Sequence, residues 1–134
     1  MKLPCEIAAK TVVPSIRALL AKELTEAHGL KQKEAADLMG ITQTAISKYA
    51  HQVRGRVLPI EESEEVKTRI IKIAISLTEG HLDRITLAMR ICDTCRFVRE
   101  NRLMCHLCQR ADPALDTGRC TVCHSSSVTS SKGC

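Results

Sequence analysis

The sequence predicts an all-α fold that leads into a cysteine-rich C-terminal region. In four segments apolar residues recur at intervals of three and four, which places them on one face of a helix. Gly29, Gly40 and Gly80 follow three of these segments, and glycine readily takes the left-handed conformation that ends many helices. Six of the eight cysteines form three Cys-x-x-Cys pairs beyond the last segment. Helices are therefore the expected framework, and the cysteines need a separate explanation.

The N-terminal half is expected to contain three helices, over residues 14–27, 31–39 and 42–51. Pro14 suits the first turn of the first helix, where a missing N–H is no loss. The apolar stripe of that helix comprises Ile16, Leu19, Leu20 and Leu24. The other two helices are short and separated by Gly40, which predicts a tight turn between them.

A longer helix is expected after Ser63, whose hydroxyl can cap it, and Glu64 and Glu65 suit its first turn. Its main apolar stripe comprises Val66, Ile70, Ile73, Ala74 and Leu77. Ile71 and Ile75 add a second apolar face, so this helix needs two packing partners. We expect a second subunit to cover the second face; the alternative is full burial of the helix in a compact monomer.

The last predicted helix spans residues 81–91 and leads directly to Cys92. Its expected inward side chains are Leu82, Ile85, Ala88 and Met89. We interpret residues 61–91 as a helical linker and dimerisation segment.

Charge and composition narrow the class of protein. The net charge is +5, and residues 1–60 hold most of it, with 9 basic and 5 acidic side chains. This excess favours a phosphate-binding face in the N-terminal segment. Tyr49 and Phe97 are the only aromatic residues, which argues against recognition of single strands by base stacking. No signal peptide or membrane span is evident, so we expect a cytoplasmic protein with reduced thiols.

The stretch KQKEAADLMGITQTAISKYAH has the pattern of a helix-turn-helix. Ala36 lets a second helix cross closely, Gly40 closes the first helix, and Thr42 can cap the second. Ile41 and Ile46 are expected in the core, which turns the polar side chains of the second helix outward. In this motif the outward surface enters the major groove of double-stranded DNA. The alternative is an ordinary amphipathic helix pair.

This stretch resembles the Cro and phage-repressor (Xre) family of transcriptional regulators. The residues that carry the likeness are Gln32, Gln43, Thr44, Ala45, Ile46, Ser47 and Lys48. The leading segment, residues 3–24, also resembles a group of archaeal regulators of this family. The resemblance implies a sequence-specific regulator, a repressor that binds double-stranded DNA as a homodimer.

The expected DNA-binding residues are Gln32, Thr42, Gln43, Thr44, Ser47, Lys48, Arg54 and Arg56. Gln43 suits an adenine edge, and Lys48 suits a phosphate. Arg54 and Arg56 flank Gly55 at the end of the unit, where they are candidates for phosphate contacts or solvated loop arginines.

The three Cys-x-x-Cys pairs between residues 92 and 123 indicate a metal site, because this spacing lets both sulfurs of a pair turn toward one ion. The expected ligands are Cys92, Cys95, Cys105, Cys108, Cys120 and Cys123. Six thiols exceed one four-ligand site and fall short of two. His106, His124 or Cys134 could complete a second zinc site, or two of the thiols could exchange during redox change. Reduced structural cysteines or disulfides are the alternative.

Four thiolates hold an iron–sulfur cluster ([4Fe–4S] or [2Fe–2S]) as well as they hold Zn²⁺. The resemblance to archaeal regulators with C-terminal cysteine clusters implies an iron–sulfur cluster that senses redox or iron status, with Zn²⁺ as the alternative. Cys5 stands apart and is expected to be a buried free cysteine that acts as a small hydrophobe.

The predicted organisation is a helix-turn-helix DNA-binding domain (residues 1–60), the dimerisation segment (61–91), a cysteine-rich metal or iron–sulfur region (92–124) and a flexible tail (125–134). No catalytic triad, paired-carboxylate or phosphate-loop pattern is present, so we expect no enzyme, no small-molecule substrate and no membrane partner. A thiol–disulfide enzyme is disfavoured because no strand-rich pattern surrounds the cysteine pairs. The alternative function is a zinc-stapled helix-turn-helix adaptor whose C-terminal module binds another protein.

Overall fold

The computed structural model describes residues 2–52 and 59–123, and this part of the chain is helical with no β-strand. Its elements in order are α1 (Pro4–Lys10), α2 (Val12–Lys22), the π-turn η1 (Glu23–Ala27), α3 (Gln32–Met39), α4 (Gln43–Gln52), the 3-10 turn η2 (Pro59–Glu62), α5 (Glu64–Thr78), α6 (Arg84–Glu100) and α7 (Cys105–Ala111). None of the described helices is long and apolar enough to cross a bilayer.

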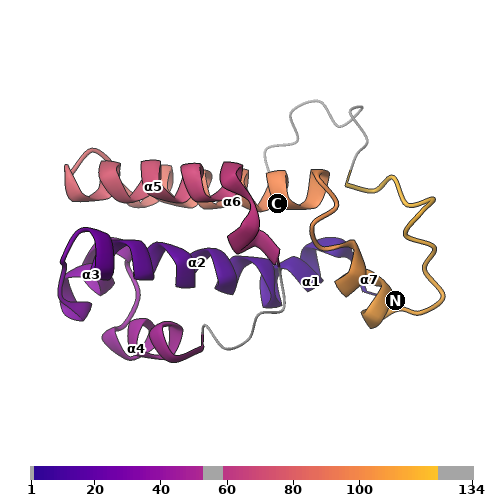
Figure 1. Ribbon diagram of the computed structural model, residues 1–134, viewed down its shortest axis with the longest axis horizontal. Helices are drawn as coiled ribbons and strands as arrows, with labels where there is room; N and C mark the ends of the chain where they lie inside the picture. Colours follow the sequence, from indigo (N-terminus) through magenta and orange to yellow (C-terminus); the bar gives the residue numbers. More distant parts are fainter. Residues whose placement is uncertain (1, 53–58, 124–134) are drawn as a thin grey trace.

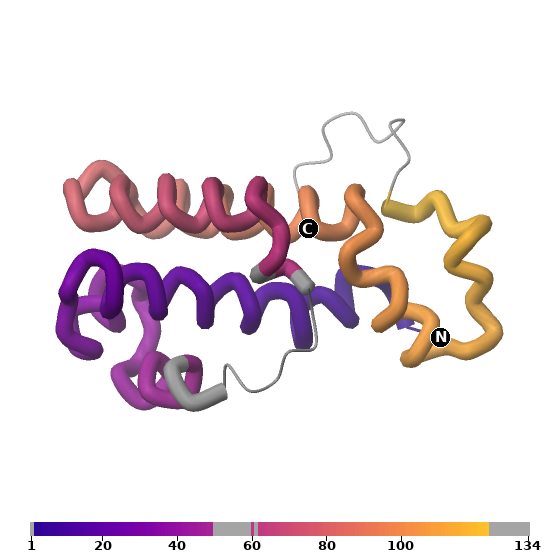
Figure 2. Tube along the Cα trace, viewed as in Figure 1, coloured from indigo at the N-terminus to yellow at the C-terminus, as the bar shows by residue number. Residues whose placement is uncertain are grey.

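Helix α2 is the centre of the molecule, because α1, α4, α5 and α6 all pack against it. Figure 1 shows α5 and α6 as an antiparallel pair that runs alongside α2. Helices α3 and α4 lie at one end of α2, and α7 lies at the other end beside α1. The fully buried side chains of the central segment are Val12, Ile16, Leu20 and Leu24. The stretch after α7, drawn in yellow in Figure 2, extends beyond the helices.

The N-terminal helix α1 is absent from the sequence-based prediction. Its signals are local: Pro4 stands in the first turn, and the backbone N–H of Leu3 donates to Glu6 Oε2 at 2.7 Å. Thr11, with φ −127° and ψ −60°, separates α1 from α2. Consequently α2 begins at Val12, two residues before the predicted start, and its last turn widens into η1 ahead of Gly29.

The prediction for α5 is confirmed. Ser63 Oγ accepts from the Val66 N–H at 3.3 Å, which caps the helix. All members of its main stripe are buried: Val66, Ile70, Ile73, Ala74 and Leu77. Ile71 and Ile75 are 42% and 40% exposed, so the single chain leaves the second apolar face of α5 partly in solvent.

The predicted inward face of the last helix is wrong. Ile85 and Met89 are 73% and 60% exposed, Ala88 is exposed, and only Leu82 is partly buried. The side chains that face the core are instead Leu87, Ile91, Thr94, Cys95 and Val98. This stripe becomes visible only if the helix continues beyond Cys92, as α6 does up to Glu100. Helix α6 thus crosses the predicted boundary between residues 91 and 92 without a break.

Candidate functional site

The turn between α3 and α4 has the geometry that the sequence predicts. Gly40 has φ +69°, in the left-handed region, and ends α3. The Ile41 N–H donates to the Ala36 carbonyl at 3.0 Å, which satisfies a carbonyl near the helix end. Ala35 and Ala36 are buried, and α3 packs against α4. These contacts fix the angle at which α4 leaves the turn.

Helix α4 presents a polar face because its apolar residues are held inward. Thr42 Oγ1 accepts from the Ala45 N–H at 3.1 Å, which confirms the predicted cap. Ile46 is 1% exposed and packs into the core. With Ile46 inward, the helical period turns the neighbouring polar residues toward solvent.

We call Gln43, Thr44, Ser47 and Lys48 the reading face of α4. Gln43, Thr44 and Lys48 are exposed, and Ser47 is half-buried. Gln32 and Thr42, the other expected DNA-binding residues of the motif, are exposed as well. Arg54 and Arg56 lie outside the described residues. An amide, hydroxyls and an ammonium group are thus presented together on one short helix.

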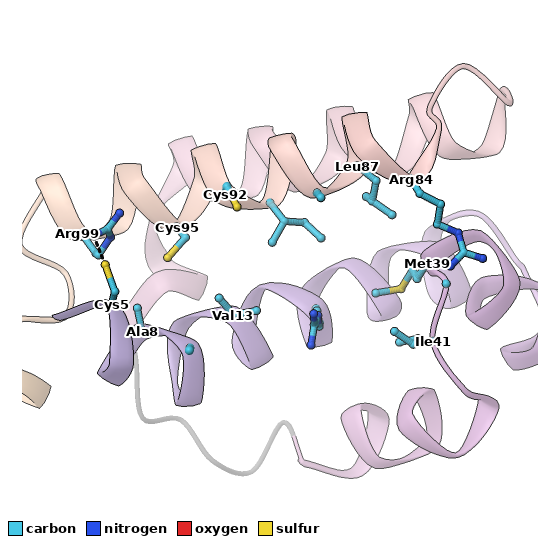
Figure 3. Close-up of a pocket in the computed structure, with 15 residues that line it drawn as sticks. Cys5, Ala8, Val13, Met39, Ile41, Arg84, Leu87, Cys92, Cys95 and Arg99 are labelled. Atoms are coloured by element: carbon cyan, nitrogen blue, oxygen red, sulfur yellow. Dashed lines mark hydrogen bonds between the residues drawn. The ribbon is translucent and has the colours of Figure 1, made fainter. Parts of the chain in front are cut away.

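The structure adds a contact to this turn that the sequence analysis missed. The guanidinium of Arg84, at the start of α6, lies against Gly40, so close that a Cβ at position 40 would collide with it. Figure 3 shows Arg84 reaching from α6 toward the end of α3 beside Met39. The glycine signals a left-handed turn in the sequence, but no sequence pattern indicates an arginine from another helix above it.

Four of the six expected metal ligands form what we call the four-thiol group: Cys105 and Cys108 on α7, and Cys120 and Cys123 in the following stretch. Burial raises the pKa of Cys108, and negative charge on Cys123, Cys105 and Cys120 raises it further. The pKa of Cys123 is likewise raised, chiefly by burial. The neighbouring thiols therefore contribute to the raised pKa values of Cys108 and Cys123.

The stretch that carries Cys120 is tied to the end of α6. Arg102 has φ +60° and turns the chain after α6. Its Nη1 donates to the carbonyl of Thr117 at 3.0 Å. Asp116 Oδ1 accepts from the Gly118 N–H at 3.0 Å and forms a local turn. These bonds tie the stretch before Cys120 to the turn between α6 and α7.

Cys5 is exposed, so the prediction that it is buried is wrong. Its Sγ accepts from Arg99 Nη1 at 3.2 Å, a contact between α1 and α6. Arg99 also lies near Cys123, because its charge lowers the pKa of that thiol. Arg99 therefore lies close to both Cys5 on α1 and Cys123 of the four-thiol group.

The remaining expected ligands, Cys92 and Cys95, lie on the body of α6 and point toward α1 and α2 (Figure 3). They line a groove together with Cys5. Within residues 2–52 and 59–123, no three or more His, Cys, Asp or Glu side chains are arranged to hold a metal ion. The structure thus separates the cysteines into two sets, and metal ligation by either set stays a prediction.

One segment of the chain matches a known protein family. Residues 22–53 match the family described as helix-turn-helix, of the Cro and phage-repressor (Xre) type. This segment runs from the end of α2 through α3 and α4, and it includes the whole reading face. The match indicates a DNA-binding transcription regulator. No curated protein and no solved structure matches the chain.

Proposed function

We propose that the chain is a sequence-specific, dimeric repressor that reads double-stranded DNA with α4 and carries a metal centre in its cysteine region. The observation that supports this most is the reading face itself. Its polar side chains are presented to solvent on a helix fixed by a left-handed glycine and a threonine cap, inside the segment that matches the helix-turn-helix family.

The chemistry of the reading face suits a major groove. Gln43 can donate to and accept from one adenine edge, and the hydroxyls of Thr44 and Ser47 can bond to either donors or acceptors. Lys48 supplies a cation for a phosphate, and Gln32 at the start of α3 can bond to a second phosphate. Arg54 and Arg56 are proposed as further phosphate contacts.

Dimerisation is proposed through the second apolar face of α5. Ile71 and Ile75 lie on the side of α5 opposite its buried stripe and are about two-fifths exposed. A two-fold related copy of α5 would cover both side chains on each subunit. Such a pairing sets the distance between two reading faces, which must match two half-sites about one helical turn apart.

We propose the four-thiol group as the metal centre, filled by an iron–sulfur cluster that reports redox or iron status. Four thiolates are the donor set that such clusters take. The proposal is supported by the raised pKa values of Cys108 and Cys123, to which the neighbouring thiols contribute. Metal binding would require the stretch after α7 to close further, since metal sites commonly order as the ion binds. Helix α6, continuous from the α3–α4 turn to the cysteine region, would carry that change to the DNA-binding end.

The DNA half of the proposal is tested by selecting duplexes from a random pool and measuring affinity against salt. We expect one preferred sequence, bound at least about a thousandfold more tightly than random DNA at physiological salt. Thr44→Glu should abolish binding by placing a carboxylate on the reading face. Ala111→Glu is the matched control on α7, also exposed and away from both α4 and the second apolar face of α5, and should bind as the parent does. Absence of any preferred sequence, or equal loss in both variants, would refute DNA reading by α4.

The metal half is tested by anaerobic purification, an absorption spectrum and metal analysis. A brown protein with iron and sulfide supports the sensor, and the loaded and stripped forms should then differ in DNA affinity. A colourless protein with stoichiometric zinc, together with weak salt dependence of DNA binding, would replace the sensor by the zinc-stapled adaptor.

A further inference from the structure

A groove of about 340 Å³ runs between α6 and the α1–α2 segment and ends at the α3–α4 turn (Figure 3). Its lining comprises the side chains of Cys5, Ala8, Ala9, Val13, Arg17, Met39, Gly40, Ile41, Arg84, Leu87, Ala88, Ile91, Cys92, Cys95 and Arg99. Arg84 and Arg99, at its two ends, are separated by about 22 Å of helix at the usual rise per residue. We call this the α2/α6 groove. Its volume lies in the range of small-molecule sites in proteins.

The wall of the α2/α6 groove is mostly aliphatic. Small side chains on α1 and α6, such as Ala9 and Ala88, leave the space open, and Val13, Leu87 and Ile91 provide apolar surface. The thiols of Cys92 and Cys95 extend this surface, because a protonated cysteine packs as a small hydrophobe. A ligand that fills the groove therefore needs a mainly hydrocarbon body.

The polar groups of the groove have one sign of charge. Three arginines line it, and no aspartate or glutamate does. Arg99 already donates to Cys5. Among the described residues, neither Arg17 nor Arg84 forms an ion pair with a carboxylate. Cations beside apolar surface, with no acidic partner in the wall, favour an anionic group on the ligand.

We propose that the α2/α6 groove binds a small amphipathic anion, an aliphatic chain with a terminal carboxylate, whose head group contacts Arg17 and Arg84. The hydrocarbon body lies along Val13, Ala88 and Ile91. The ligand carboxylate pairs with these arginines, because none of the described aspartates or glutamates lines the groove to do so. This ligand is an effector and undergoes no reaction in the groove.

The position of the groove gives the ligand a route to the DNA-binding end. Met39, Gly40 and Ile41 form both the end of the groove and the turn that sets the direction of α4. A ligand that draws the Arg84 guanidinium along the groove and away from Gly40 removes the contact that α6 makes with the α3–α4 turn. This regulatory step rests on the proposed DNA-binding function; the binding of the ligand does not.

The first test measures ligand binding without DNA, by isothermal titration of the full chain with decanoate and with decan-1-ol. We expect saturable binding of decanoate that is at least about tenfold tighter than that of the alcohol. Arg17→Gln and Arg84→Gln should each weaken decanoate binding about tenfold. Arg96→Gln is the matched control, since Arg96 is exposed on α6 outside the groove.

A second pair of variants tests the place of binding. Ala88→Leu fills the groove with a helix-compatible side chain and should abolish decanoate binding, whereas Ala27→Leu, exposed outside the groove, should leave it unchanged. Equal affinity for acid and alcohol, no effect of either arginine variant, or no saturable binding would overturn the proposal. Conversion of a dimer to a monomer by Ala88→Leu would also overturn it, and would assign the groove to a second copy of the chain.

The regulatory step is tested last, by adding decanoate to a complex with the selected DNA. We expect a change in DNA affinity of at least about fivefold, the usual scale of allosteric coupling. Unchanged DNA affinity with intact decanoate binding would overturn the regulatory step alone. A chain that binds decanoate and no DNA would refute the proposed function and leave the ligand site standing.

Discussion

Arg84 of α6 covers Gly40, the residue that turns α3 into α4. The two residues are 44 positions apart in the sequence. Their contact joins the helix that leads to the cysteines with the turn that directs the reading face. Gly40 is therefore constrained twice, by its backbone conformation and by a side chain from another helix.

Gly40→Ala should destabilise the fold more than Gly29→Ala does. Both glycines have left-handed φ angles, +69° and +65°, so alanine at either position costs about 1–2 kcal/mol. A Cβ at position 29 meets no atom within 4 Å, whereas at position 40 it displaces Arg84. Urea unfolding followed by circular dichroism gives both losses. The excess cost of Gly40→Ala should vanish in an Arg84→Ala background; an excess that persists there would mean that Arg84 is not its source.

Much of the fold follows from local sequence signals. The left-handed glycine, the Thr42 and Ser63 caps and the α5 stripe all depend on residues within a few positions of one another, and each is confirmed. The error in α6 has a different cause. Its core stripe extends on both sides of Cys92, and a helix assumed to end at the first cysteine hides the second half of the stripe.

The arrangement of the cysteines could not be predicted, because equal spacing does not imply an equal environment. Cys92 and Cys95 lie within a long helix and face a groove, whereas Cys105 and Cys108 lie on a short one. The contact of Cys5 with Arg99 joins residues 94 positions apart and leaves no trace in any local pattern.

The cap of α6 should give the protein a dependence of stability on pH in the acid range. Asp83 Oδ1 accepts from the Thr86 N–H at 2.7 Å, and this bond lowers the pKa of the carboxyl below its ordinary value of 3.8. Because the folded-state pKa of Asp83 is lowered, its carboxylate stabilises the fold at pH values above the unfolded-state pKa. This stabilisation is lost as the pH falls through the folded-state pKa.

Asp83→Asn keeps a capping side chain without the charge, so its difference in unfolding free energy from the parent should shrink as the pH falls from 6 toward about 2. Urea unfolding at several pH values measures it. Asp37→Asn, an exposed position on α3, is the control. A difference that is constant over this range would show that the Asp83 charge does not contribute.

Gln43 and Lys48 should affect DNA binding in different ways. Gln43→Ala removes the proposed base contact and should reduce discrimination at one base pair by about 1–3 kcal/mol. Lys48→Ala removes the proposed phosphate contact, so it should weaken all sequences alike and reduce the salt slope by about one. Affinities for the selected site and its single-base variants, each over a range of salt, measure both effects. Identical profiles for the two variants would contradict the roles assigned to them.

Replacement of Ile71 and Ile75 together by serine should weaken the dimer at least tenfold, because each isoleucine buried at an interface contributes about 1.5–3 kcal/mol. The monomer should stay folded, since both side chains are partly exposed within one chain. Sedimentation equilibrium gives the dimer dissociation constant. Ile85→Ser on α6, which is 73% exposed, is the control and should leave the dimer intact. A parent protein that sediments as a monomer would exclude this interface.

The division of the cysteines into two sets predicts two outcomes for single Cys→Ser variants. Replacement of Cys108 or Cys120 removes one of four thiolates, so metal content after anaerobic purification should fall by at least about tenfold. Replacement of Cys92 should leave metal content unchanged, because its thiol lies on the body of α6 and lines the α2/α6 groove.

Cys5→Ser tests whether the cysteine that contacts Arg99 contributes to metal binding. This variant removes the sulfur that accepts from Arg99 and leaves the four thiols in place. Its metal content should match the parent protein. Equal loss of metal from Cys92→Ser and Cys108→Ser would instead place ligands from both sets on one centre and contradict the division of the cysteines.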